Sequence, residues 1–91
     1  MFGEPAWDML LTLYVGSRSG ARQTVSNLSR SSGSSPTTAL RWIDYLEGQA
    51  FVARRASPTD RRITYVDLTD AGRNAVEDYF AKLLAEGVIS T

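Results

Sequence analysis

Apolar residues near the start of the chain recur with the three- and four-residue spacing of helices. Pro5 suits a first helical turn, and the apolar spacing after it predicts a helix over residues 5–17, ended by the glycines within residues 16–20. Thr24 is a suitable N-cap for a helix over residues 25–31. Two helices are therefore expected first, and the second is short and polar.

A third helix follows and has the clearest signals. Ser35 and Pro36 form a cap followed by a proline, and three apolar side chains then repeat along one helical face up to Gly48. These three are Ala39, Ile43 and Leu46. Between the second and third helices, Gly33 favours the tight turn that a helix-turn-helix needs.

After the third helix the spacing becomes that of strands. Residues 51–55 and 63–68 are short β-rich runs on either side of a polar stretch of Ser, Pro, Thr and Asp at 57–60, which predicts a hairpin. Thr69 then caps a last helix that extends to about Ala85. The predicted order is helix, helix, helix, strand, strand, helix.

This order defines the predicted fold class. A short helix, a tight turn, a longer helix and a hairpin are typical of a winged helix-turn-helix, mostly α with a small β-hairpin. The chain of 91 residues, 43% of them apolar, is long enough for one compact core and too short for two, so we predict a single domain over residues 1–91. Residues 74–91 are expected to be shared between that core and a dimer interface.

Composition excludes several kinds of chemistry. The chain has no cysteine and no histidine, which removes disulfides, the usual zinc sites and the catalytic groups built on those side chains. We therefore expect no cofactor. No apolar run is long enough to span a bilayer, and the first residues do not follow a signal-peptide pattern, so a cytoplasmic protein is expected.

Charge is unevenly distributed along a chain whose formal net charge is zero. Residues 22–62 carry seven arginines against three acidic residues, whereas residues 63–91 carry two basic residues against five acidic ones. A basic central stretch on a neutral chain is compatible with double-stranded DNA as the partner.

The third helix presents residues that could read DNA. With its apolar side chains turned inward, its outer face shows Thr37, Thr38 and Arg41, which can reach phosphates, hydrogen-bond base edges and touch thymine methyl groups. Arg41 is the strongest candidate for a base contact, and an arginine paired with guanine contributes roughly 1–3 kcal/mol of discrimination. The alternative is a solvated Arg41 paired with Asp44 or Tyr45.

The tip of the predicted hairpin carries a second cationic feature, the sequence Asp60-Arg61-Arg62. The minor groove attracts arginine through its concentrated negative potential, so this tip could lie along or within that groove. Asp60 is unsuited to contact a phosphate, but it could fix the direction of one arginine through a charge-assisted hydrogen bond. The alternative is a polar tip whose charges only keep the hairpin soluble.

Two longer segments of the sequence indicate a particular protein family more specifically than any of these features alone. They are LRWIDYLEGQAFVARR, residues 40–55, and PTDRRITYVDLTDAGR, residues 58–73, and they belong to a stretch that begins at Val25 and runs to Gly72. This part of the chain resembles the MarR family of winged-helix transcriptional regulators. The resemblance implies double-stranded DNA binding, with the third helix in the major groove and the wing at the minor groove. By position, Asp60 would orient Arg62, Arg62 would enter the minor groove, and Arg61 would lie nearer the backbone.

The resemblance also implies roles at the foot of the wing and beyond it. Arg54 and Arg55 would contact the DNA backbone, although one of them could instead pair with Asp67 across the hairpin. Members of this family are usually longer, with extra helices at both ends that build the dimer and often a pocket for a small effector.

Dimerisation is expected because palindromic sites call for two-fold symmetric readers. The last helix and the tail also carry more apolar surface than a small core needs to cover. The candidate interface residues are Tyr79, Phe80, Leu83, Leu84, Val88 and Ile89. Some of them must also close the core against the first helix, around Trp7 and Leu10.

Two other classes of function are weaker. A winged helix can serve as a protein-interaction module without DNA binding, and Leu40 and Trp42 would suit that role if exposed, but the arginines argue against it. An enzyme using Asp44, Asp60 and Asp67 with a divalent metal is disfavoured, because nothing in their spacing makes them converge. We therefore predict a DNA-binding regulator and not an enzyme.

Overall fold

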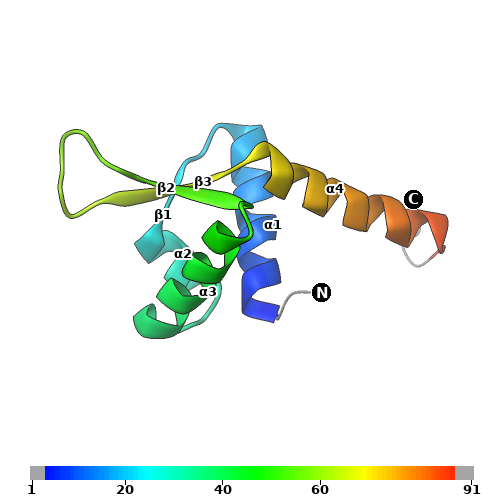
Figure 1. Ribbon diagram of the computed structural model, residues 1–91, viewed down its shortest axis with the longest axis horizontal. Coiled ribbons are helices and arrows are strands. Elements are labelled where there is room, and N and C mark those ends of the chain that lie inside the picture. The colour runs from blue at the N-terminus through cyan, green and yellow to red at the C-terminus, as the bar shows by residue number, and fades with distance from the viewer. Residues whose placement is uncertain (1–3, 88–91) are drawn as a thin grey trace.

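The computed structural model describes residues 4–87 (Figure 1). In chain order the elements are α1 (Glu4–Ser19), β1 (Gln23–Thr24), α2 (Val25–Ser31), α3 (Pro36–Gly48), β2 (Val52–Ala56), β3 (Thr64–Leu68) and α4 (Asp70–Ala85). The predicted fold class is confirmed, and α2, α3 and α4 occupy the predicted segments. Two details differ: α1 extends to Ser19, and β1 was not predicted.

The sheet has three antiparallel strands in the order β1-β3-β2, so a short third strand joins the predicted hairpin. In β1, Gln23 pairs with Val66 and Thr24 pairs with Tyr65. A strand of two residues is too short to show an alternating pattern, which is why the sequence did not reveal it. Thr24 also caps α2 by accepting a hydrogen bond from the Asn27 amide, so the sheet holds the start of the helix-turn-helix.

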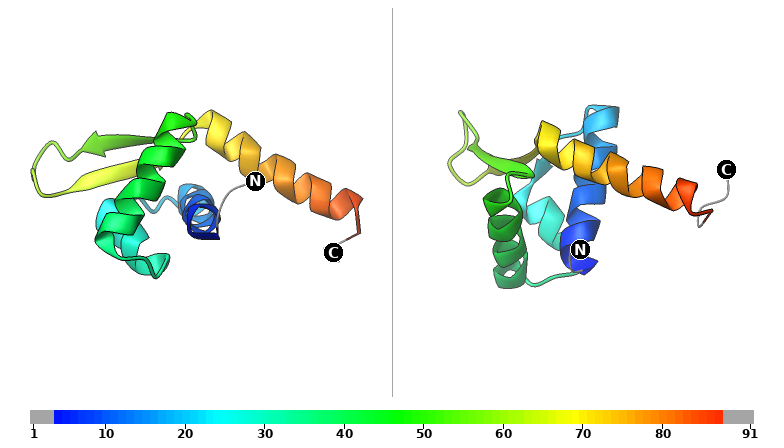
Figure 2. Two further views of the ribbon diagram at one scale, coloured as in Figure 1. Left: turned by 60° about the horizontal axis from the view of Figure 1, so that its bottom comes forward. Right: turned by 45° about the vertical axis from the view of Figure 1, so that its right-hand side comes forward.

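The core forms where the three N-terminal helices meet one face of the sheet and the first half of α4. Its largest fully buried side chains are Met9, Leu10, Leu28, Ile43, Leu46, Val66 and Val76. Burying a side chain of this size stabilises the fold by about 1.5–3 kcal/mol. The hairpin and α4 project from the core in opposite directions in every view (Figures 1 and 2).

The start of α4 is held against the turn between α3 and β2. Thr69 donates its hydroxyl to the Ala50 carbonyl at 2.6 Å and its amide to the Phe51 carbonyl at 3.1 Å. The Thr69 side-chain oxygen also caps α4 by accepting a hydrogen bond from the Gly72 amide. Gly72 is buried, and a Cβ at this position would collide with the Phe51 carbonyl oxygen, so only glycine fits at this joint.

Candidate nucleic-acid interface

The recognition helix α3 separates a buried face from an exposed one. The Ser35 hydroxyl caps it by accepting a hydrogen bond from the Thr38 amide at 3.3 Å, and Pro36 occupies the first turn. Its buried side chains are Ala39, Ile43 and Leu46, as predicted. Thr37, Thr38 and Arg41 are all exposed, so the residues predicted to read DNA lie on the outer surface.

Arg41 has no hydrogen-bond or ion-pair partner among residues 4–87, so the alternative pairing with Asp44 or Tyr45 is not found. Asp44 instead bonds Arg54, with the oxygen and nitrogen 2.6 Å apart. The Tyr45 ring lies edge-on to the half-buried Trp42 ring, with centroids 5.9 Å apart. The Arg41 guanidinium therefore remains available to a ligand.

The tip of the wing contains the predicted contact between Asp60 and Arg62. The Nε and Nη2 atoms of Arg62 donate to the two carboxylate oxygens of Asp60, each at 3.2 Å, and the Arg62 amide donates to Oδ1 at 3.0 Å. These hydrogen bonds, the side-chain ones first, hold the pKa of Asp60 below its ordinary value. The Arg62 side chain is still 90% exposed, and Arg61 beside it is exposed too. The wing thus presents a cation whose direction is fixed.

Arg54, one of the two arginines predicted to contact the DNA backbone, is bound by two acidic residues of α3. Its Nη2 lies 2.7 Å from Glu47 Oε1 and 2.6 Å from Asp44 Oδ1, and its amide donates to Glu47 Oε2 at 3.3 Å. Hydrogen bonding from Arg54 lowers the pKa of Glu47, and hydrogen bonding to Glu47 in turn raises the pKa of Arg54. This arrangement disfavours a direct DNA contact by Arg54. We call Asp44, Glu47 and Arg54 the helix–wing clamp.

Arg55, by contrast, shares Asp67 with an arginine that the sequence did not single out. Arg22 donates two hydrogen bonds to Asp67, at 3.0 and 3.2 Å, whereas the Arg55 Nε lies 3.3 Å from one oxygen. The Arg22 guanidinium also stacks 4.0 Å from the centre of the Tyr65 ring, and the bond to Asp67 raises the pKa of Arg22. Of the two arginines at the foot of the wing, Arg55 and not Arg54 is therefore the one that pairs with Asp67. Its side chain is still 68% exposed.

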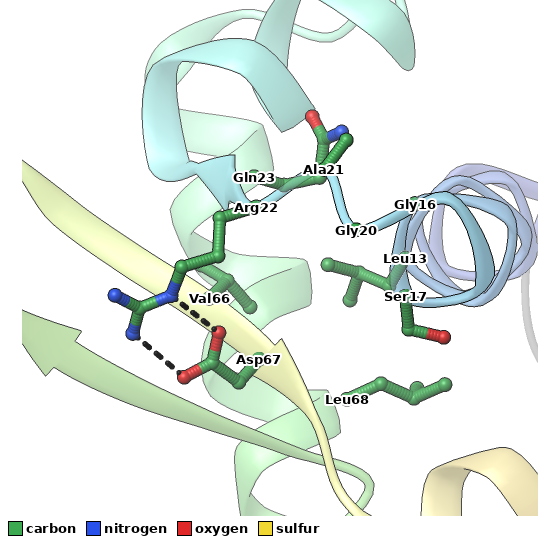
Figure 3. Close-up of a pocket in the computed structure, with 10 residues that line it drawn as sticks. All are labelled: Leu13, Gly16, Ser17, Gly20, Ala21, Arg22, Gln23, Val66, Asp67 and Leu68. Carbon is green, nitrogen blue, oxygen red and sulfur yellow. Dashed lines mark hydrogen bonds and ion pairs between the residues drawn. The ribbon is translucent and has the colours of Figure 1, made fainter.

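A hollow of about 250 Å³ lies beside this network, between α1, the loop after it and β3 (Figure 3). It is open to solvent, and the pair Arg22–Asp67 forms part of its lining. In residues 4–87 no group of three or more His, Cys, Asp or Glu side chains gathers to hold a metal ion. Asp44, Asp60 and Asp67, the carboxylates considered for a metal enzyme, do not gather in this part of the chain, and each is instead paired with arginine.

A second depression joins α3 to the wing, and we call it the central groove. Its lining residues are Thr24, Val25, Ser26, Asn27, Leu40, Arg54, Arg62, Ile63 and Thr64. The helix-turn-helix and the hairpin lie on the same side of the molecule, away from the far end of α4 (Figure 2). The recognition helix, the groove and the wing thus form one continuous face.

The predicted dimer residues on α4 divide into two groups. The Tyr79 ring packs edge-on against Trp7 with centroids 4.4 Å apart, and Phe80 packs against the core. Leu83 is half-buried and Leu84 is 47% exposed. Val88 and Ile89 lie outside the described residues. Tyr79 and Phe80, in the near part of this apolar stripe of α4, therefore serve the core, whereas Leu84 in its far part is not covered by the residues that the structure describes.

A capped recognition helix, a hairpin with a tethered arginine at its tip and a groove between them define the winged helix-turn-helix class. The family model described as the MarR family matches residues 4–64, which run from the start of α1 to the first residue of β3. This chain belongs to the MarR family, as the resemblance in its recognition helix and wing predicted.

Three similar proteins show how far the likeness extends. The HTH-type transcriptional regulator YwaE of Bacillus subtilis is 33% identical over 75 residues, which are 82% of this chain and 42% of YwaE. A riboflavin kinase of Pyrococcus abyssi is 37% identical over 60 residues, which are 66% of this chain and 27% of the kinase. The crystal structure of the Staphylococcus aureus MepR–DNA complex superimposes with a TM-score of 0.79 at 21% identity, over 94% of this chain and 66% of that one. The chain thus spans less than half of both curated relatives.

Among the described residues, no helix combines the length and the apolar character needed to cross a membrane.

Proposed function

We propose that this chain binds double-stranded DNA sequence-specifically as a transcriptional regulator. In this proposal α3 enters the major groove and the tip of the wing lies at the adjacent minor groove. Thr37, Thr38 and Arg41 read base edges, Arg61 and Arg55 contact the backbone, and Arg62 enters the minor groove. The protein would then act in the cytoplasm, where its DNA would be found.

One observation carries the proposal: Arg62 is held by both oxygens of Asp60 and yet is 90% exposed. An exposed ion pair of this kind contributes little to stability, so its effect is to limit the directions that the guanidinium can take. A preoriented arginine at a hairpin tip suits insertion into a minor groove, because less conformational freedom is lost on binding. The unpaired Arg41 on the same face adds a cation where a base would lie.

In this proposal the helix–wing clamp has a supporting role. An arginine released to a phosphate would leave the carboxylates of Asp44 and Glu47 without their partner, close to a polyanion. Arg54 therefore holds the wing at a fixed angle to α3, and Arg55 takes the phosphate. Arg55 can leave Asp67 at little cost, because Arg22 keeps that carboxylate paired.

The regulator also acts as a homodimer in this proposal. The support is the apolar stripe at the far end of α4, where Leu84 is 47% exposed. A two-fold pair of such chains would read an inverted repeat, with one recognition helix in each half-site. Sedimentation that shows only monomer at micromolar concentration would remove this part of the proposal.

The test is selection of duplexes from a random pool, followed by fluorescence-anisotropy titration of the enriched sequence at several salt concentrations. We expect an enriched inverted repeat and a fall of log affinity with log salt of about 0.9 per phosphate neutralised. Absence of binding at low salt would favour the alternative, a winged helix used for protein interaction. The exposed Leu40 is the observation that keeps this alternative in view.

A further inference from the structure

The central groove contains an apolar side chain that none of the proposed DNA contacts uses. Leu40 is 42% exposed, although it belongs to the helix that also supplies three core residues. On one side it lines the central groove with Arg62 and Thr64, and on the other it lines a smaller hollow with Val25 and Pro36. Leu40 is therefore the apolar centre of the face formed by α2, α3 and the wing.

The surroundings of Leu40 indicate what could cover it. The groove is bordered by the Arg62 guanidinium, by the hydroxyl groups of Thr24, Ser26 and Thr64 and by the Asn27 amide. Groups of these kinds make most contacts to phosphate and sugar oxygens in protein–DNA complexes. Thr24, Asn27 and Arg62 already have partners within the chain, but the Ser26 and Thr64 hydroxyls have none among the described residues. An apolar protein surface seated here would bury those hydroxyls unsatisfied and take water from the 90% exposed Arg62 side chain, which is costly. DNA would satisfy the polar border and also offer an apolar group, because thymine carries a methyl group in the major groove.

We propose that Leu40 reads a thymine by packing against its C5-methyl group. This inference rests on the proposed function and adds a base preference to it. Leu40 and Arg41 are neighbours on α3 and point about 100° apart around the helix axis. Leu40 faces the wing, so the thymine lies on the wing side of the base pair that Arg41 contacts. The two side chains together define adjacent positions of the half-site, one read by an apolar contact and one by hydrogen bonds.

The test replaces each thymine of the selected duplex by uracil, one position at a time, which removes only the methyl group. We expect one position in each half-site at which this change weakens binding by about fourfold, the factor expected for one buried methyl group. Leu40→Ala should weaken binding to the thymine duplex by a similar or larger factor and should be indifferent to uracil at that position. Leu40→Met, which keeps an apolar side chain, should retain the sensitivity.

Val15→Ala is the control, because it removes apolar atoms from a side chain that is 64% exposed on α1, outside the proposed DNA contacts and the proposed dimer interface. It should respond to uracil as the parent does, and thermal unfolding of all variants would show that they are folded. If every uracil substitution is neutral, or if Leu40→Ala keeps the full uracil effect, the thymine contact is overturned while DNA binding stands. Unchanged DNA binding by Leu40→Ala would also overturn it. Failure to select any duplex would overturn the proposed function first.

Discussion

Replacing Ala50 by glycine should stabilise the protein, because α3 ends in a conformation that glycine prefers. Ala50 has a φ of 64°, and it is the only non-glycine residue in the described part of the chain with a positive φ. Its amide donates to the Glu47 carbonyl at 2.9 Å, and the Phe51 amide donates to the Leu46 carbonyl at 3.0 Å. This pair of hydrogen bonds is the Schellman motif, in which the left-handed position is usually glycine.

The size of the effect follows from two opposing terms. The left-handed conformation costs an L-residue with a Cβ about 1–2 kcal/mol. Glycine in turn loses more backbone entropy on folding, by roughly 0.5–1 kcal/mol. The Ala50 side chain is exposed, so no core contact is lost. The difference between these terms lies between about 0 and 1.5 kcal/mol. Ala50→Gly should therefore raise the free energy of unfolding by the midpoint, about 0.8 kcal/mol, which corresponds to a rise in Tm of roughly 3–6 °C for a domain of this size.

The measurement is urea unfolding, with an m value equal to that of the parent protein. Ala81→Gly is the control, since Ala81 is exposed within α4, where φ is helical and glycine should cost about 1 kcal/mol. The two substitutions are chemically identical and should shift stability in opposite directions. If Ala50→Gly destabilises the protein as Ala81→Gly does, α3 does not end in the way described.

Further predictions concern the DNA-facing surface and the two carboxylates, Glu47 and Asp60, that pair with its arginines. Arg62→Ala should weaken binding and remove a preference for A·T-rich flanks, and Arg41→Ala should relax discrimination within the half-site; titrations in which both bind like the parent would refute the proposed docking. Glu47→Gln should lower the ratio of specific to nonspecific affinity because it loosens the helix–wing clamp, and a ratio that rises instead would make Arg54 a DNA contact. Both Glu47 and Asp60 have lowered pKa values, so their stabilising contribution is complete above the ordinary carboxyl range and is lost as pH falls below about 4. Urea titrations across that range should show a shallower loss for Glu47→Gln, and equal slopes would contradict the pairing.

Local chemistry was sufficient to predict the helices. Thr24, Ser35 and Thr69 were chosen as caps from their residue types and positions, and each side chain accepts the expected hydrogen bond from an amide at the start of its helix. Local chemistry also predicted that Asp60 pairs with one arginine of the hairpin tip, and the family resemblance indicated that this arginine is Arg62, as the structure shows.

The ion pairs at the foot of the wing could not be predicted in the same way. Neighbouring residues of a strand point to opposite faces of a sheet, so Arg54 and Arg55 had to have different surroundings. Which of them faces α3 depends on how the sheet packs on the helices, and no local pattern reports that. Arg22 and Asp67 are 45 residues apart and meet only because β1 pairs with β3. A strand of two residues left no signal from which that pairing could be inferred.

The close contact between Gly72 and the Phe51 carbonyl, at the start of α4, affects the geometry of the proposed dimer. α4 is held to the body at its first turn and along its near half, where Val76 is buried and Tyr79 packs on Trp7. It is a rigid helix of 16 residues, about 24 Å long, whose far end extends beyond the core. A tilt of about 10° at the joint would displace the far end by about 4 Å. If two chains associate through those far ends, small changes of angle at Gly72 become changes in the distance between the two recognition helices. The spacing of half-sites that the regulator accepts would then be set by how α4 seats on the body, at the Phe51 carbonyl and along Val76 and Tyr79, well away from both the DNA and the subunit interface.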